Sequence, residues 1–368
     1  MKTAVKLLIA PFAFFALFQS IGSADESVRP QIYFRARGYV AVSTTTHPLR
    51  RALRDLPGLL PWPVVFQDAA HTIAQNFVNF QDYDGASPYF HQGCDLRSAG
   101  DSEVVAPVDG ILEGGYYGYT NLPTGAMQKQ WQPWNGQTHA DPYFELAIVT
   151  EDGYRFEMHH VDSQKLPAFT VQALNQGHVR VKAGTVIGKV NAWAFPGYSH
   201  VHYNIIRPDG VFANPEYYSI PLPDHTAPAI LGVFALTPDG KATALRPGEV
   251  LPFHPAQFVV ASTESHDRDA YVQTPPIARI HFASGGSFAW NFRQWLVGPD
   301  GHFPDIRQVF DLDGLALPDG RRLETFGQYG KGMFLIRLPV GAADHGEFEI
   351  ALADTTGNSS VFRAALAH

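Results

Sequence analysis

Residues 143–161 read YFELAIVTEDGYRFEMHHV, and this stretch sets the expectation for the fold. Two runs rich in aromatic and branched residues flank an Asp-Gly pair, which is typical of a tight β-hairpin turn. Comparable short runs, separated by Gly or Asp-Gly turns, recur at 103–115, 178–193 and 200–210. Aromatic residues make up 13% of the chain, and 33 Gly and 28 Pro interrupt its apolar runs, which favours strands over long helices. The sequence therefore predicts a mainly β protein.

The chain has 368 residues, of which 45% are hydrophobic, so it can build more than one core. Beyond a Pro-rich segment, PLPDHTAPA, strand-like runs resume at intervals typical of a sandwich. We expect a small antiparallel β-sheet domain followed by an immunoglobulin-like β-sandwich. The predicted divisions are a signal peptide at 1–24, an N-terminal extension at 25–61, a first β domain at 62–220, a linker at 221–229 and the sandwich domain at 230–368.

The first 24 residues have the pattern of a secretory signal: lysines at 2 and 6, an apolar stretch at 7–18, then small residues before a cleavage point. The apolar stretch is shorter than the ~20 residues that a membrane span requires, which favours cleavage over anchoring. No later segment is long and apolar enough to cross a bilayer. We therefore expect an exported protein, periplasmic or extracellular, with no membrane span after signal removal.

Net charge and cysteine content argue against a nucleic-acid-binding protein and against a protein stabilised by disulfides. Removal of the signal takes away two of the 27 basic residues and changes the formal net charge from −8 to −10. An acidic surface repels phosphate backbones, so a nucleic-acid partner is not expected. Cys94 is the only cysteine, so the chain can form no internal disulfide, and we expect this thiol to be buried.

Histidines and one aspartate form the pattern that indicates chemistry. In HQGCD, His91 and Asp95 are four residues apart, and Gly93 between them allows the backbone to bend so that both side chains reach one point. In the HVH of 200–202, the period of two along a strand places His200 and His202 on one face. Metal binding requires such convergent partners, because a lone histidine is more often a surface or packing residue.

A further histidine pair ends the hairpin strand quoted above. The same period of two places Phe156, Met158 and His160 on one face and His159 on the other, with charged residues. Taken alone, His160 is more simply interpreted as a satisfied core histidine.

Four segments occur in the order of the motif blocks of the M23 metallopeptidase family, also called the lysostaphin/LytM type. HQGCDLRSAGDSEVVAPVDGIL at 91–112 resembles the opening block of that family, and MHHV at 158–161 resembles its Y-A-H-L segment. VKAGTVIGKV at 181–190 and SHVHYNI at 199–205 are similar to the third and fourth blocks. The resemblance spans 73–218, and it departs from the family pattern at Cys94, Met158, His159 and Asn204 without removing a catalytic group.

The resemblance implies a role for each matching histidine and aspartate. His91, Asp95 and His202 would bind one zinc ion, and His200 and His160 would lie beside it as catalytic residues. We expect His200 to be the general base and His160 the oxyanion partner, although the two roles could be exchanged. Zinc with three protein ligands keeps a position for water and lowers the pKa of that water toward ~7.

The implied activity is that of a zinc metalloendopeptidase in which metal-activated water hydrolyses amide bonds of peptidoglycan stem peptides or cross-bridges. The alternative is a non-catalytic cell-wall-binding regulator of other wall hydrolases, but such regulators typically lose metal ligands. A third reading, a secreted protease acting on Gly-rich proteins, would share the mechanism. The segment at 116–142 is longer than a typical hairpin loop and carries aromatic residues. It either lines the substrate-binding cleft or is an ordinary packed loop.

Overall fold

The computed structural model describes residues 59–82, 88–193, 198–325 and 332–367. The predicted signal peptide at 1–24, and all but the last three residues of the predicted extension at 25–61, lie outside these ranges. The described chain is mainly β with several antiparallel sheets, as predicted. None of the helices among the described residues combines the length and the apolar character needed to cross a bilayer.

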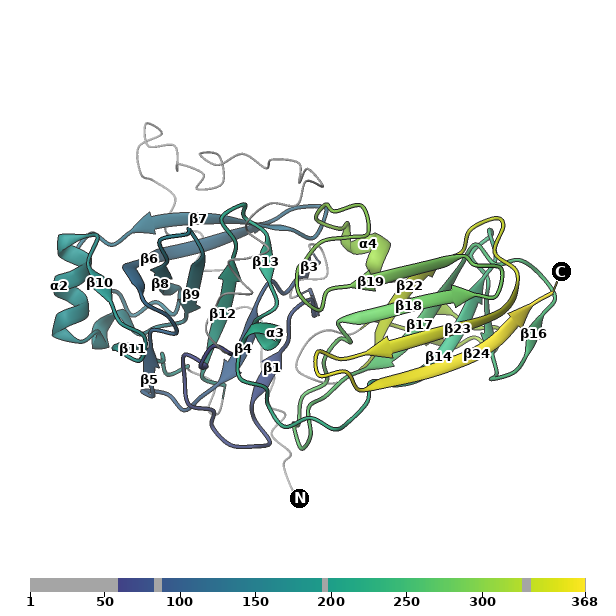
Figure 1. Cartoon of the computed structure of the whole chain (residues 1–368), viewed down its shortest axis with the longest axis horizontal. Coiled ribbons are helices and arrows are strands. Elements are labelled where there is room, and N and C mark those ends of the chain that lie inside the picture. The colour runs from purple at the N-terminus through teal and green to yellow at the C-terminus, as the bar shows by residue number, and fades with distance from the viewer. Residues whose placement is uncertain (1–58, 83–87, 194–197, 326–331, 368) are drawn as a thin grey trace, which may run out of the picture.

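The largest sheet occupies the first half of the described chain (Figure 1). Its neighbouring strands are all antiparallel. In spatial order they are β1 (Ile73–Gln75), β4 (Cys94–Arg97), β12 (His200–Ile206), β9 (Arg155–His159), β8 (Phe144–Val149), β6 (Gly110–Asn121) and β10 (Arg180–Val181), with β13 (Phe212–Ala213) beside β12 and β7 (Met127–Pro133) beside β6.

Apolar and polar side chains alternate along the central strands, so the two faces of this sheet differ in character. Successive side chains of a strand point to opposite faces, so apolar residues at every second position cover one face. Tyr203 on β12 and Phe156 and Met158 on β9 have no exposed surface and belong to the hydrophobic core. The opposite face of these strands therefore carries the histidines and charged residues.

Short elements complete this half of the chain. They are β2 (Phe80–Gln81), β3 (Tyr89–Phe90), β5 (Glu103–Val105), the 3-10 helix η2 (Ser163–Lys165), α2 (Ala168–Gln176), β11 (Val186–Lys189) and α3 (Pro215–Tyr218). Helix α2 was not predicted from the sequence. It buries only Thr170 and Ala173, and it ends at Gly177, whose φ of 65° is a conformation that glycine adopts readily.

Two further sheets form the second half of the described chain (Figure 1). The four-stranded sheet contains β15 (Ala242–Leu245), β14 (Ala229–Leu236), β17 (Gln257–Thr263) and β22 (Phe334–Pro339), and the five-stranded sheet contains β16 (Val250–Leu251), β24 (Ser359–Leu366), β23 (Gly346–Ala353), β18 (Ile277–Phe282) and β19 (Ser287–Asn291). Phe258 of one sheet packs on Phe348 of the other, with ring centroids 4.7 Å apart. The remaining elements are α4 (Ile306–Val309), β20 (Leu315–Ala316) and β21 (Arg322–Leu323).

The two halves share apolar and polar contacts. Asn76 Nδ2 donates to the Thr274 carbonyl over 2.9 Å, and Gln273 Nε2 donates to the Ile73 carbonyl over 2.7 Å. Phe90 packs against Phe303 with ring centroids 5.7 Å apart. The division of the chain into domains at 221–229 stays a prediction.

Candidate metal centre

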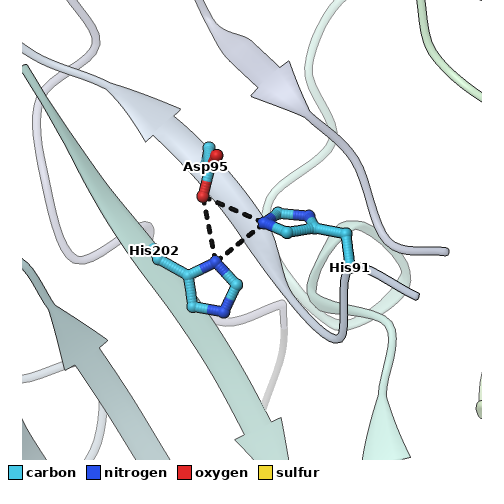
Figure 2. A group of neighbouring side chains, drawn as sticks. All are labelled: His91, Asp95 and His202. Carbon is cyan, nitrogen blue, oxygen red and sulfur yellow. Dashed lines mark hydrogen bonds and ion pairs between the residues drawn. The ribbon is translucent and has the colours of Figure 1, made fainter. Parts of the chain in front are cut away.

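Two neighbouring strands and the connection between β3 and β4 bring the predicted zinc ligands together (Figure 2). Asp95 on β4 lies directly opposite His202 on β12, so their side chains share a face. Asp95 Oδ1 lies 3.0 Å from His91 Nε2 and 2.9 Å from His202 Nδ1, and the two nitrogens are 2.8 Å apart. The three residues are 3–7% exposed. A carboxylate oxygen and two imidazole nitrogens thus converge on one point.

The chain bends at Gly93, as predicted, although the φ of this residue is not positive. Its surroundings give a second reason for glycine at this position. A Cβ atom on Gly93 would lie 2.1 Å from Asn204 Oδ1 and 2.4 Å from the Tyr203 carbonyl oxygen. Glycine is therefore required here because the 91–95 segment approaches the backbone of β12 too closely for any side chain.

The donor set fits zinc. Zinc in proteins binds imidazole nitrogen and carboxylate oxygen at about 2.0–2.2 Å, and ligands around a tetrahedral ion lie roughly 3.3 Å apart. The three donor atoms are slightly closer than that, so a small opening would place them at the required spacing. His91 Nδ1 lies 3.0 Å from the Asn76 carbonyl oxygen, which requires a proton on Nδ1 and leaves Nε2 free to bind a metal.

The protonation states also suit metal binding, which needs an ionised carboxylate and neutral imidazoles. Burial favours the neutral acid, but the nearby His91 and His200 outweigh it and hold the pKa of Asp95 well below its usual value. Burial, together with the neighbouring His91, lowers the pKa of His202 to about 3. At neutral pH Asp95 is therefore charged and His202 is neutral.

His200 and His160 lie together beside the three donors. His200 Nε2 is 3.7 Å from Asp95 Oδ1, and the rings of His160 and His200 have centroids 4.7 Å apart. His200 Nδ1 donates to the Tyr198 carbonyl over 3.0 Å, and His160 Nδ1 donates to the Pro142 carbonyl over 2.9 Å. Burial lowers the pKa of both histidines. Each neutral ring therefore presents Nε2 as a proton acceptor.

The expectation that His160 continues the apolar face of Phe156 and Met158 is wrong. Strand β9 ends at His159, and His160 has a φ of 63°, in the left-handed region that non-glycine residues rarely adopt. This turn redirects the side chain toward His200, and Tyr117 Oη lies 3.2 Å from its Nδ1. Such conformations are often found at functional sites, where surrounding contacts hold them.

His159 also borders the site, which sequence reasoning did not anticipate. It lies opposite His202 in the β9–β12 pairing, and the two rings have centroids 5.0 Å apart. Its Nε2 is 3.0 Å from an oxygen of Glu145 and 3.0 Å from one of Glu157. The prediction that His159 lies with charged residues is confirmed, and the period of two along β9 was the signal.

Two cations neutralise these carboxylates. Lys129 Nζ contacts Glu145 and lies 2.7 Å from Glu157 Oε1, while Arg155 lies 2.7 Å from an oxygen of each glutamate. Glu145, Glu157 and His159 are close enough to hold a metal ion. Because Lys129 and Arg155 already balance the two negative charges, this group is better explained as an internal salt-bridge network.

The long segment at 116–142 is largely a β-hairpin. Its first strand, β6, pairs with β7 from Gly115 opposite Pro133 to Asn121 opposite Met127. Beyond the hairpin, the backbone N–H of His139 donates to Tyr116 Oη over 2.8 Å. The first part of the segment is therefore regular β structure, residues 135–140 are exposed, and Tyr117 lies beside His160 as described above. The role of the segment as a wall of the cleft stays a prediction.

Cys94 is buried, as predicted. Its relative exposure is 0%, and it lies opposite Tyr203 in the β4–β12 pairing. Alternation along β4 directs it to the apolar face, away from Asp95. Its Sγ lies 3.8 Å from Glu216 Oε1. Cys94 is therefore a core residue and not a fourth donor.

Comparison with protein-family models and with curated proteins finds no match. Among solved structures, the chain is similar to lysostaphin from Staphylococcus simulans at 12% identity and a TM-score of 0.26, over 82% of this chain and 99% of that one. It is also similar to a zinc-containing peptidase from Vibrio cholerae (16% identity, TM-score 0.28, 45% and 41% covered) and to the SpoIIQ–SpoIIIAH pore-forming complex (17%, 0.29, 44% and 90%). Likenesses at these identities and TM-scores carry no conclusion on activity, so function is inferred below from the side chains.

Proposed function

We propose that this chain is an M23-type zinc metalloendopeptidase that hydrolyses amide bonds in the peptide part of peptidoglycan. The supporting observation is the convergence of His91, Asp95 and His202, with His200 and His160 on the same side. Five residues from segments far apart in the sequence thus form one centre. Non-catalytic regulators of this family typically lose metal ligands, so the complete set favours an enzyme.

His91 Nε2, Asp95 Oδ1 and His202 Nδ1 would hold the zinc ion. When bound, zinc supplies Lewis acidity that polarises a carbonyl and acidifies water. Two nitrogens and one oxygen from the protein leave one position of a tetrahedral ion for a non-protein ligand, as in catalytic zinc sites.

His200 is suited to accept a proton. Its Nδ1–H is engaged by the Tyr198 carbonyl, so Nε2 carries the free lone pair and faces Asp95 Oδ1 at 3.7 Å. Because burial lowers the pKa of His200, the ring is neutral at pH 7, as a general base must be. The proton that it accepts could then be passed to the leaving amine.

His160 is suited to the second role, beside the substrate carbonyl. Pro142 and Tyr117 hold its Nδ1 side, so the ring orientation is fixed and Nε2 is directed away from them. Nε2 can donate to an oxyanion only after the ring gains a proton. We therefore assign His160 as the oxyanion partner, which donates while the single proton taken up by His200 resides on the His160 ring and before that proton reaches the leaving amine.

The peptidoglycan substrate follows from the resemblance and from the predicted export to the wall-facing compartment. A regulator of wall hydrolases and a protease of Gly-rich proteins are the competing functions. Incubation with isolated sacculi and with a Gly-rich protein, followed by separation of the fragments, distinguishes the three. The proposal expects fragments with new amino termini from sacculi, and none after removal of zinc by a chelator.

Matched variants test the role that is proposed for each residue. We expect His202→Ala to lose both zinc and activity, and His200→Ala to retain one zinc per chain but lose activity by at least about a hundredfold. His302→Ala, an exposed histidine of the second half, should resemble the wild type. Full fragment release by His200→Ala would refute the assignment of the base. A zinc-loaded wild type that binds sacculi without cleaving them would favour the regulator.

A further inference from the structure

Three carboxylates from distant segments meet away from the zinc centre. Asp224 lies between α3 and β14, Glu264 directly follows β17, and Asp354 directly follows β23. One oxygen of each lies within 4.8 Å of the others. Like charges gathered at this distance repel one another, so the cluster needs a positive partner or a bound proton.

The carboxylate of Glu264 forms no hydrogen bond with any described residue. Glu264 is 4% exposed, and both Oε1 and Oε2 lack such a partner. Its backbone, by contrast, is held by two hydrogen bonds to Gln273, of 2.9 Å and 2.7 Å. A buried carboxylate with both oxygens unpartnered is costly, and the backbone fixes it in that position.

His266 and Arg293 line the same cavity as Asp224. The charge of His266 partly offsets that of Asp224 and Glu264, but the direct contacts of both cations are with other groups. His266 Nε2 lies 3.4 Å from Glu216 Oε2, and Arg293 Nε donates to the Thr355 carbonyl over 3.1 Å. Among the described residues, no salt bridge involves any of the three carboxylates. Burial, together with the charges of Asp354 and Asp224, raises the pKa of Glu264 to about 9, so without a cation Glu264 holds a proton at neutral pH, and a bound cation would displace it.

We propose that Asp224, Glu264 and Asp354 bind one divalent cation of the calcium class. Calcium prefers carboxylate oxygens at about 2.3–2.6 Å, so oxygens that share one calcium ion lie within about 5 Å of each other. The observed spread agrees with that limit. A donor set of oxygens alone also separates this site from the zinc centre, which contains two imidazoles.

A cavity lies beside Asp224, one of the three carboxylates, whereas Glu264 and Asp354 do not line it. Its volume is about 580 Å³, and Asp224, His266, Thr355 and Thr356 are among its lining residues. Asp354 is already oriented, because its Oδ1 accepts from the backbone N–H groups of Gly357 and Asn358 and its Oδ2 accepts from Asn358 Nδ2. The bound ion would tie the predicted linker at 221–229 to the ends of β17 and β23.

Calcium titration of the full chain tests this site. Calorimetry with calcium chloride should give one site per chain, and calcium should raise the Tm more than sodium chloride of equal ionic strength. Calcium sites of extracellular modules have Kd values of about 10⁻⁴–10⁻³ M, so the titration should extend to about 10 mM. We expect Glu264→Gln and Asp224→Asn each to weaken binding at least tenfold.

The control is Glu347→Gln, which makes the same chemical change at an exposed position on β23 and should bind calcium like the wild type. His202→Ala should also bind calcium normally, so loss of the zinc centre and loss of this site are distinguishable. Absence of saturable binding by the wild type would overturn the proposal. Binding of wild-type strength by either Glu264→Gln or Asp224→Asn would overturn it as well.

Discussion

His91 Nε2 and His202 Nδ1 lie 2.8 Å apart, although 111 positions separate the two residues in the chain. Two nitrogen lone pairs at this distance repel each other unless a proton or a cation lies between them. Both nitrogens also contact Asp95 Oδ1, and these contacts likewise require a proton or a cation between the atoms. The pairing of β4 with β12 therefore creates a site at which either a proton or a metal ion would relieve the repulsion between these atoms.

The first prediction concerns zinc affinity. Replacing His202 with alanine removes one of the three zinc donors. Loss of a residue that only hydrogen-bonds to a ligand lowers metal affinity 10–100-fold, so loss of a ligand should lower zinc affinity by more than that. Competition with a chromophoric chelator measures the change, and His302→Ala is the control. A variant that retains wild-type affinity would exclude His202 as a ligand.

The second prediction concerns Gly93. Gly93→Ala places a Cβ 2.1 Å from Asn204 Oδ1, so the 91–95 segment must move away from β12. We expect a loss of about 1–3 kcal/mol in the free energy of unfolding, and weaker zinc binding because His91 and Asp95 move with the backbone. Urea unfolding and zinc titration measure the two effects.

Gly118→Ala is the matched control for that substitution. Its φ is not positive, and its new Cβ would meet only Gln130 Oε1, at 4.0 Å. This variant should have wild-type stability and zinc affinity. If Gly93→Ala behaves in the same way, the close approach to β12 is not a constraint.

The third prediction concerns the buried charges beside the centre. Lys129→Met leaves Glu145 and Glu157 with Arg155 as their main cation, and breaking a buried ion pair in this way costs about 3–5 kcal/mol. Equilibrium unfolding in urea measures the loss. Lys182→Met, which breaks an exposed pair with Asp109, should change stability little. Equal effects of the two substitutions would contradict the proposed importance of the network.

The sequence predicted the parts of the site that depend on local periodicity. Alternation along a strand is enough to place His200 and His202 on one face, and a hairpin turn at Asp-Gly is enough to predict β8 and β9. The same reasoning placed His160 on the wrong face. His160 adopts a left-handed backbone conformation, which changes the direction of its side chain, and a histidine in the sequence does not predict that conformation.

Features that join distant segments were not predictable from one sequence. Lys129 reaches Glu145 and Glu157 only because β7 folds over as a hairpin with β6, and a lysine within a strand normally faces solvent. Asp224 and Asp354 likewise meet only through the packing of the second half of the chain. Periodicity determines the face of a strand on which a residue lies, but the partners on that face depend on strand order.

The fourth prediction uses the only thiol of the chain to measure the fold around the centre. Cys94 has no exposed surface, and burial raises the pKa of its thiol, so it should not react with a thiol reagent at pH 8 until the protein opens. If zinc binds as proposed, it would stabilise the folded state by mass action and slow the reaction further, because Cys94 is adjacent to Asp95 in β4. Denatured protein should react at once with one equivalent, since the chain has one cysteine. A fast equivalent in the native, zinc-loaded protein would contradict the buried position of β4, and with it the geometry of the centre.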